Sequence, residues 1–88
     1  MQNTVSQAYY SVLYYNDFMI NVEVGKRLKE SRKANKLTQR QVSEMLGIVL
    51  QQYQTYESGR YQLDYDKLIK VCKILNVSAD YLLGLSDV

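Results

Sequence analysis

The side chains with the clearest chemical pattern lie between residues 49 and 58 and carry amides or hydroxyls. At 100° per residue, a helix over this stretch would have one polar, uncharged face formed by Gln51, Gln54, Thr55 and Ser58. The opposite face would carry Val49, Tyr53 and Tyr56, which we expect to point toward a core. Solvated helix faces usually carry lysine and glutamate, whereas a glutamine amide can form two hydrogen bonds with adenine, at N6 and N7. The pattern favours contact with base edges over the alternative, a merely polar surface.

Residue types needed for catalysis or for metal binding are scarce in this chain. It has no histidine and a single cysteine, Cys72, so neither a zinc site with nitrogen and sulfur ligands nor an internal disulfide is expected. No nucleophile–base pair, paired carboxylates or phosphate-cradling loop can be recognised. The sequence therefore predicts a protein that is not an enzyme and that holds no metal and no cofactor.

Charge is unevenly distributed along the 88 residues, although the net charge is only +2. Of the 11 basic residues, eight lie between residues 22 and 62, against four acidic ones. A clustered basic excess suits a polyanionic partner, and the alternative on charge alone is an ordinary solvated helix face. The N-terminal residues lack a positive region ahead of an apolar run. We therefore expect no signal peptide, no membrane span and a cytoplasmic location.

Two short helices with a tight turn between them would position the polar face. Thr38 and Gln41 form a capping-box pattern that starts a helix reaching to about residue 46, and Gly47 ends it. The next helix is predicted over residues 50–57, before Gly59. Apolar side chains at Val42, Met45, Leu46 and Ile48 are expected to be buried with the two tyrosines. With the small Ser43 at the crossing, this is a helix-turn-helix, which places its second helix in the major groove of DNA.

Three further helices are predicted around this pair. The first runs from about residue 21 to residue 35, with an apolar stripe of Val24, Leu28, Ser31 and Ala34. A fourth helix follows the N-cap Asp64 and ends at Asn76, with apolar residues Leu68, Ile69, Val71, Cys72 and Leu75 at helical spacing. Ser78 caps a short fifth helix over residues 79–83, which Gly84 closes.

Residues 1–21 form an extension that differs in composition from residues 22–88, which we treat as the folded domain. The extension is rich in aromatic residues, namely Tyr9, Tyr10, Tyr14, Tyr15 and Phe18. Helical spacing of Val5, Ala8, Tyr9, Val12 and Leu13 suggests a short amphipathic helix, and the aromatic content would also suit a strand. Three roles stay open: packing on the domain, a dimer contact, or binding another protein.

Residues 24–84 resemble the Cro/C1-type (Xre-family) helix-turn-helix domain of phage repressors and bacterial regulators. The resemblance lies in Val24-Gly-Lys-Arg-Leu28, Leu37-Thr-Gln39, Gly47-Ile48, Tyr56-Glu-Ser-Gly59 and Val77-Ser-Ala-Asp-Tyr-Leu-Leu-Gly84. It implies an all-α, five-helix, lambda-repressor-like domain, with the extension as a possible sixth helix. The sequence departs from the family pattern at Val49, where serine or threonine is usual, and at Leu50, where a polar residue is usual.

The family resemblance also implies roles for individual residues. The base-facing residues would be Leu50, Gln51, Gln54 and Thr55, and the DNA-backbone contacts would be Gln39, Ser58 and Arg60. Gln39 would also steady a recognition side chain. Arg32 and Glu57 would form a structural ion pair between the first and third helices, and the alternative for Arg32 is a phosphate contact or a free surface charge. Possible dimer contacts are Tyr81, Leu82 and Leu85, with the N-terminal tyrosines as a second candidate.

The function implied is that of a sequence-specific regulator of transcription that binds double-stranded DNA. The simplest form is a repressor that acts as a homodimer on a pseudo-palindromic operator. One alternative is an antitoxin-type regulator whose residues 1–21 bind a partner protein. Another is a protein-interaction module that has lost specific DNA binding, which the apolar Val49 and Leu50 keep open.

Overall fold

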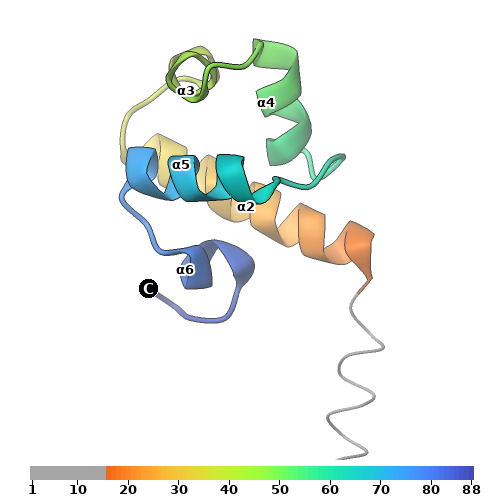
Figure 1. Ribbon diagram of the computed structural model, residues 1–88. Coiled ribbons are helices and arrows are strands. Elements are labelled where there is room, and N and C mark those ends of the chain that lie inside the picture. The colour runs from red at the N-terminus through yellow and green to blue at the C-terminus, as the bar shows by residue number, and fades with distance from the viewer. Residues whose placement is uncertain (1–15) are drawn as a thin grey trace, which may run out of the picture.

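The structure, a computed structural model, describes residues 16–88, apart from the side chain of Asp17 (Figure 1). All regular secondary structure in this range is helical, which confirms the all-α prediction. The helices are α2 (Asp17–Ala34), α3 (Gln39–Leu46), α4 (Leu50–Glu57), α5 (Tyr65–Leu75) and α6 (Ala79–Leu83). The predictions for residues 1–15 lie outside the described part of the chain.

Helix α2 begins one turn earlier than the sequence pattern predicted. Asn16 is its N-cap, and the Asn16 side chain accepts a hydrogen bond from the Met19 amide at 2.9 Å. A cap of this kind satisfies an amide that the helix itself leaves unpaired. The start near residue 21 was therefore wrong, because it was placed at the apolar stripe rather than at the capping residue.

The other helix boundaries agree with the sequence prediction. Thr38 Oγ1 accepts from the Gln41 amide at 3.0 Å, and the Thr38 amide donates to Gln41 Oε1 at 2.8 Å, which completes the capping box. Asp64 and Ser78 cap α5 and α6 by accepting hydrogen bonds from the amides of Lys67 and Tyr81. Gly47, Asn76 and Gly84 end their helices in the left-handed conformation. Local capping chemistry thus determines most of the boundaries.

Each of the five helices contributes to one hydrophobic core. Its buried members are Val24, Leu28, Val42, Leu46, Tyr53, Tyr56, Val71, Leu75 and Leu82. In the view of Figure 1, α3 and α4 lie above the level of α2 and α5, and α6 lies below it. Helix α2 contacts both α4 and α6, and α5 contacts both α3 and α6. None of the helices in residues 16–88 is long and apolar enough to cross a bilayer.

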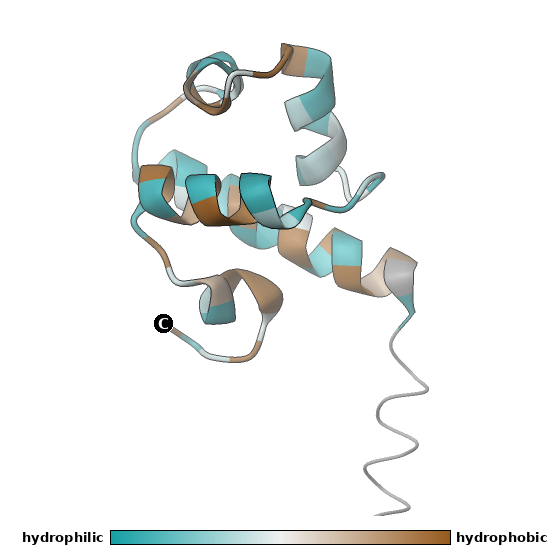
Figure 2. Cartoon of the chain, in the orientation of Figure 1, coloured by the Kyte–Doolittle hydropathy of each residue, from teal (hydrophilic) through white to brown (hydrophobic). Residues whose placement is uncertain are grey.

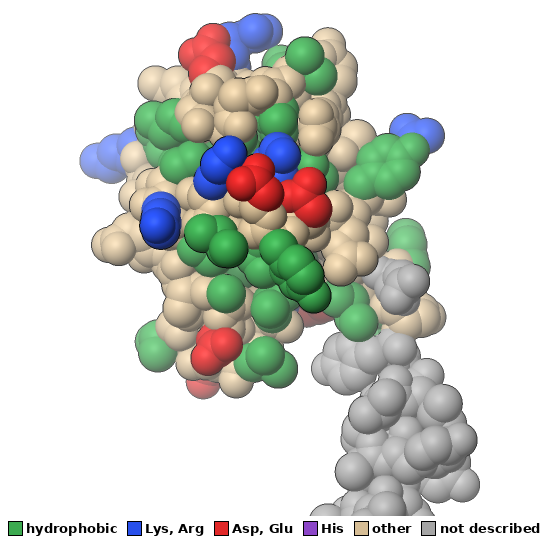
Figure 3. Space-filling model, in the orientation of Figure 1, with side chains coloured by type: hydrophobic (Ala, Val, Ile, Leu, Met, Phe, Trp, Pro, Cys, Tyr) green, Lys and Arg blue, Asp and Glu red, His purple; other side chains and the backbone are tan. Residues whose placement is uncertain are grey.

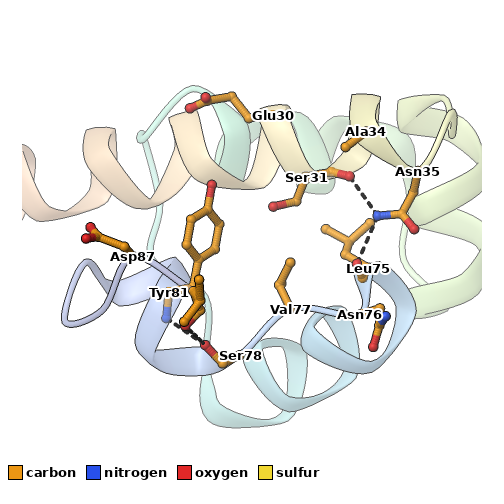
Figure 4. A pocket seen from close by; sticks show the side chains of 11 residues that line it. Glu30, Ser31, Ala34, Asn35, Leu75, Asn76, Val77, Ser78, Tyr81 and Asp87 are labelled. Atoms are coloured by element: carbon orange, nitrogen blue, oxygen red, sulfur yellow. Dashed lines mark hydrogen bonds between the residues drawn. The ribbon is translucent and has the colours of Figure 1, made fainter.

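The C-terminal ends of α2 and α5 are joined by one side-chain amide. Asn35 Nδ2 donates to the backbone carbonyls of Ser31, at 2.8 Å, and Leu75, at 2.9 Å (Figure 4). These residues line one end of an open pocket of about 700 Å³ between α2 and the segment around α6. The Asn35 amide therefore holds the C-terminal ends of α2 and α5 together.

Some apolar positions that the sequence pattern placed inside the fold are exposed. Met45 is 55% exposed and Val49 is 65% exposed. The inner face of α3 consists of Val42, Ser43 and Leu46, so Met45 turns outward. Val49 precedes the first turn of α4 in extended conformation, so the helical wheel does not apply to it. Ile69 on α5 is also exposed, at 57%.

Helix α2 and the end of α4 approach each other so closely that glycine is needed at the contact. A Cβ atom built on Gly25 would overlap the Glu57 carbonyl and lie 2.8 Å from the Tyr56 carbonyl. At Gly59, where φ is +79°, a Cβ atom would lie 2.7 Å from the Cα atom of Val22. The backbones of α2 and of the end of α4 are therefore in direct contact, and this contact sets the position of α4.

Replacing Gly25 by alanine is expected to destabilise the fold, although alanine is the better helix former. Helix propensity alone would stabilise α2 by about 1 kcal/mol, whereas forcing the backbones apart costs about 1–3 kcal/mol. The melting temperature measured by circular dichroism should fall. Lys29→Ala, at an exposed position of the same helix, is the matched control and should melt at or above the parent temperature. Equal melting of the two variants would contradict the close approach.

Candidate nucleic-acid interface

Helices α3 and α4 pack against each other across a short turn of Gly47, Ile48 and Val49. The turn is held by backbone hydrogen bonds from the Gly47 amide to the Glu44 carbonyl and from the Ile48 amide to the Ser43 carbonyl, both at 3.0 Å. Ser43 is buried, and its hydroxyl donates to the Arg40 carbonyl at 2.8 Å. This is the geometry of a helix-turn-helix.

The outer face of α4 is polar and uncharged. Gln51 and Gln54 are exposed, and Leu50 and Thr55 are half-buried on the borders of this face. Tyr53 and Tyr56 are buried on the opposite face, with ring centroids 6.5 Å apart in an edge-to-face arrangement. Most of α4 is coloured hydrophilic to neutral in Figure 2, with a hydrophobic start. The amides are thus presented to solvent by a helix that is anchored through its tyrosines.

The charged group of α4, the Glu57 carboxylate, is turned inward and receives four hydrogen bonds. Arg32 donates to it twice, from Nε at 2.6 Å and from Nη2 at 3.1 Å. The Tyr53 hydroxyl donates at 2.6 Å and Gln39 Nε2 donates at 3.1 Å. The side chains of Arg32 and Glu57 are only 10% and 4% exposed. We call Arg32, Gln39, Tyr53 and Glu57 the carboxylate cluster, and it joins α2, α3 and α4.

The ionisation of the cluster follows from these contacts. Burial acts to raise the pKa of Glu57, but the hydrogen bonds from Arg32, Tyr53 and Gln39 outweigh it and hold that pKa below its ordinary value. The hydrogen bond to Glu57 raises the pKa of Arg32. Burial, followed by the hydrogen bond to Glu57, raises the pKa of the Tyr53 hydroxyl. At neutral pH the pair is therefore ionised, and Tyr53 is a donor.

The carboxylate cluster also determines how the amide of Gln54 is oriented. A carboxylate only accepts hydrogen bonds, so Gln39 must turn its nitrogen toward Glu57 and its oxygen away from it. That oxygen, Gln39 Oε1, accepts from Gln54 Nε2 at 3.2 Å. Gln54 consequently has its own oxygen free for an outside donor. The charge of Glu57 thus determines which way the side-chain amides of Gln39 and Gln54 are turned.

The remaining residues expected to contact DNA lie around the C-terminal half of α4. Thr55 Oγ1 donates to the Gln52 carbonyl at 2.6 Å, so its hydroxyl oxygen has acceptor capacity left. The Ser58 hydroxyl donates to the Thr55 carbonyl at 3.1 Å. Arg60 is exposed, with its guanidinium carbon 5.8 Å from the centre of the Tyr61 ring. Thr55, Ser58 and Arg60 therefore lie at the C-terminal end of α4 or directly after it.

Two contacts of this region were not foreseen from the sequence. Tyr53 was assigned only to the core, yet its hydroxyl is part of the carboxylate cluster. Its spacing of four residues from Glu57 was the available signal, because residues four apart on a helix are neighbours. Gln52 Nε2 donates to the Tyr56 hydroxyl at 2.8 Å with the same spacing.

The residues expected to form a dimer contact are not equivalent in the structure. Leu82 is fully buried in the core, and its side chain is therefore not available to a partner. Tyr81 is half-buried, and Leu85 is 76% exposed. Tyr81 and Leu82 lie on α6, which packs against α2 and α5, whereas Leu85 follows the end of the helix.

Replacing Glu57 by glutamine is expected to remove a pH-dependent part of the stability. The folded pKa of Glu57 lies below its ordinary value of 4.5. Its contribution is therefore complete above about pH 4.5 and is lost as the pH falls through the folded pKa. At pH 7 we expect Glu57→Gln to lower the free energy of unfolding by about 3 kcal/mol, since Arg32 is left buried without its counter-ion.

Urea unfolding of the parent and of Glu57→Gln between pH 7 and pH 3 measures this difference. The gap between the two free energies of unfolding should narrow as the solution is acidified below pH 4.5. Glu44→Gln, at an exposed position of α3, is the control and should stay within about 0.5 kcal/mol of the parent. A gap that stays constant over the whole range would show that the charge of Glu57 is not what stabilises the cluster.

Comparison with known proteins agrees with the geometry. The family described as helix-turn-helix domain matches residues 25–88. The HTH-type transcriptional regulator ImmR of Bacillus subtilis is 40% identical over 67 residues, which are 76% of this chain and 53% of that protein. The cryptic phage CTXphi transcriptional repressor RstR of Vibrio cholerae is 36% identical over 63 residues, which are 72% of this chain and 56% of that protein.

A solved structure has the same fold. The restriction-modification controller protein C.AhdI of Aeromonas hydrophila superposes with a TM-score of 0.65 at 24% identity, over 69% of this chain and 92% of that one. The chain spans about half the length of the curated relatives it matches. The sequence motifs, the helix-turn-helix geometry and these matches together establish that the chain belongs to the Cro/C1-type (Xre) helix-turn-helix family.

Proposed function

We propose that this chain binds double-stranded DNA in a sequence-specific way and regulates transcription, with α4 in the major groove. The observation that carries the proposal is the outer face of α4, where exposed amides stand on a helix fixed by the carboxylate cluster. Glutamine amides match base edges, and a fixed helix presents them in a defined geometry. On this proposal the protein acts by binding DNA rather than by catalysis. A regulator of this kind would work in the cytoplasm.

The flanking residues support contacts with the DNA backbone. Arg60 forms no ion pair among the described residues, so its charge is available to a phosphate. Ser58 lies beside it, and the Arg60 amide is 3.4 Å from the Ser58 hydroxyl oxygen. Gln39 has one N–H left after donating to Glu57, which can reach a phosphate while its oxygen steadies Gln54. These contacts position the helix and carry little sequence information.

A homodimer is the assembly that fits the exposed apolar surface. Ile20, Leu83 and Leu85 line a hollow of about 370 Å³ between α2 and α6, together with Gly84 and the charged Glu23 and Arg27. Tyr65 adds to this surface, at 86% exposed, and Figure 3 shows hydrophobic side chains gathered over α5 and α6. Apolar surface on a small domain marks a partner site.

A two-fold dimer would place two α4 helices about 34 Å apart, as a pseudo-palindromic operator requires. Occupation of a promoter by such a dimer would repress transcription, and the relative RstR is named a transcriptional repressor.

A mobility-shift titration with the region upstream of its own gene is the direct test. We expect a specific complex whose affinity falls steeply as salt rises from 50 to about 200 mM, because phosphate contacts release counterions. An unrelated duplex of equal length is the control and should bind more weakly at both salt concentrations. Absence of any complex at low salt would refute DNA binding.

Two substitutions separate base reading from backbone contact. Gln51→Ala should weaken binding to the specific site by about 1–3 kcal/mol and leave binding to unrelated DNA nearly unchanged. Arg60→Ala should weaken both, and should reduce the salt dependence by the equivalent of about one phosphate contact. Titrations of both variants on both duplexes give the comparison. If Gln51→Ala binds the specific site like the parent protein, the base-reading role of Gln51 is wrong.

A further inference from the structure

The first turn of α4 exposes apolar side chains where a DNA-reading helix enters the groove. Val49 is 65% exposed although it immediately precedes the helix, and Leu50 at the first helical position is half-buried. Val49 makes no side-chain hydrogen bond to the amides of the first turn. Figure 2 shows this hydrophobic start at the head of an otherwise polar helix. A solvent-exposed valine that also forgoes capping is better explained by an apolar partner than by solvent.

The major groove offers one apolar group on the edges of its base pairs, the C5 methyl of thymine. Guanine and cytosine present hydrogen-bonding groups there, and adenine does as well. An apolar first turn is therefore matched to thymine and to no other base. Burial of one methyl group against Val49 or Leu50 should raise the affinity for DNA roughly fourfold.

The polar part of the same face matches the other member of an A·T pair. The side chain of Gln51 takes part in none of the hydrogen bonds within residues 16–88, so its amide can donate to adenine N7 and accept from adenine N6. Gln54 has its oxygen turned outward by Gln39 and can accept from the adenine amino group. Gln51 therefore offers both the donor and the acceptor that adenine requires, and Gln54 offers the acceptor.

The side chains that read G·C pairs are missing from this face. Guanine is read chiefly by arginine or lysine, and cytosine by aspartate or glutamate. Within α4 the charged residue is Glu57, whose carboxylate is fully engaged by Arg32, Gln39 and Tyr53. The exposed charges that flank α4 in the sequence, Arg40 and Glu44 on α3 and Arg60 after α4, lie outside the helix that would enter the groove.

From these observations we propose that the operator half-site has consecutive A·T pairs opposite the first turn of α4. Thymine methyl groups contact Val49 and Leu50, and Gln51 reads an adenine. The inference rests on the proposed function, because it assigns the bases that the proposed DNA-binding face selects. It makes Val49 and Leu50 determinants of specificity.

The test uses the whole 88-residue chain and begins with selection of binding sites from a randomised duplex library. Half-sites with adjacent A·T pairs are expected to be enriched. In the selected duplex, each thymine of the half-site is then replaced by uracil, which removes only the methyl group. We expect at least one replacement to weaken binding roughly fourfold. The same replacement at a thymine outside the half-sites is the DNA control.

Variants of the protein assign the methyl contact to its residues. In Val49→Ala and Leu50→Ala, the effect of the critical uracil should shrink to less than twofold in at least one variant. Ile69→Ala removes another exposed apolar side chain, on α5, and should retain the full uracil effect.

Each other outcome overturns the inference in a distinguishable way. Enrichment of G·C pairs at these positions, or equal binding of thymine and uracil duplexes, refutes the base assignment while leaving DNA binding intact. DNA binding without enrichment of any sequence refutes both the half-site and specific recognition. Absence of binding at low salt refutes the proposed function itself.

Discussion

A buried carboxylate that needs several donors is the constraint on which this structure depends. Glu57 is removed from water, and an unpaired charge in that position would cost several kcal/mol. Its donors come from α2, from α3 and from an earlier turn of α4 itself. The charge is therefore satisfied only when three helices adopt one mutual arrangement. The hydrophobic core provides the driving force for folding, but apolar contacts are not directional, and the carboxylate supplies direction.

The close approach of backbones at Gly25 and Gly59 complements this constraint. The carboxylate cluster fixes one side of α4 against Arg32, and the two glycines bring the C-terminal end of α4 against α2. The N-terminal end of α4 is held by the turn from α3, through Gly47 and Ile48. Attachment at both ends leaves the outer face without a structural task of its own. The amide of Gln51 is accordingly free for recognition, and Gln54 keeps its oxygen free.

Much of the fold could be predicted from the sequence because local chemistry decides helix boundaries. Thr38, Asp64 and Ser78 bind amides within their own first turns, and Gly47 adopts a conformation that other residues avoid. The exposure of Val49 and Met45 could not be predicted in this way. It depends on how α3 and α4 cross, and a helical wheel assigns a face without knowing which neighbour covers it. The burial of Leu82 likewise depends on the packing of α6 against α2 and α5.

The candidate site was predictable in its residue types and less so in its connections. The face formed by Gln51 and Gln54 follows from periodicity alone. The role of the Tyr53 hydroxyl and the hydrogen bonds of Gln39 to both Glu57 and Gln54 require the positions of three helices. The link through Gln39 has a consequence for how such proteins diverge. Position 39 can change which hydrogen-bonding groups Gln54 presents, even where its own side chain touches no base. On the proposed DNA-binding face, a single change on α3 would therefore alter which bases an unchanged α4 selects.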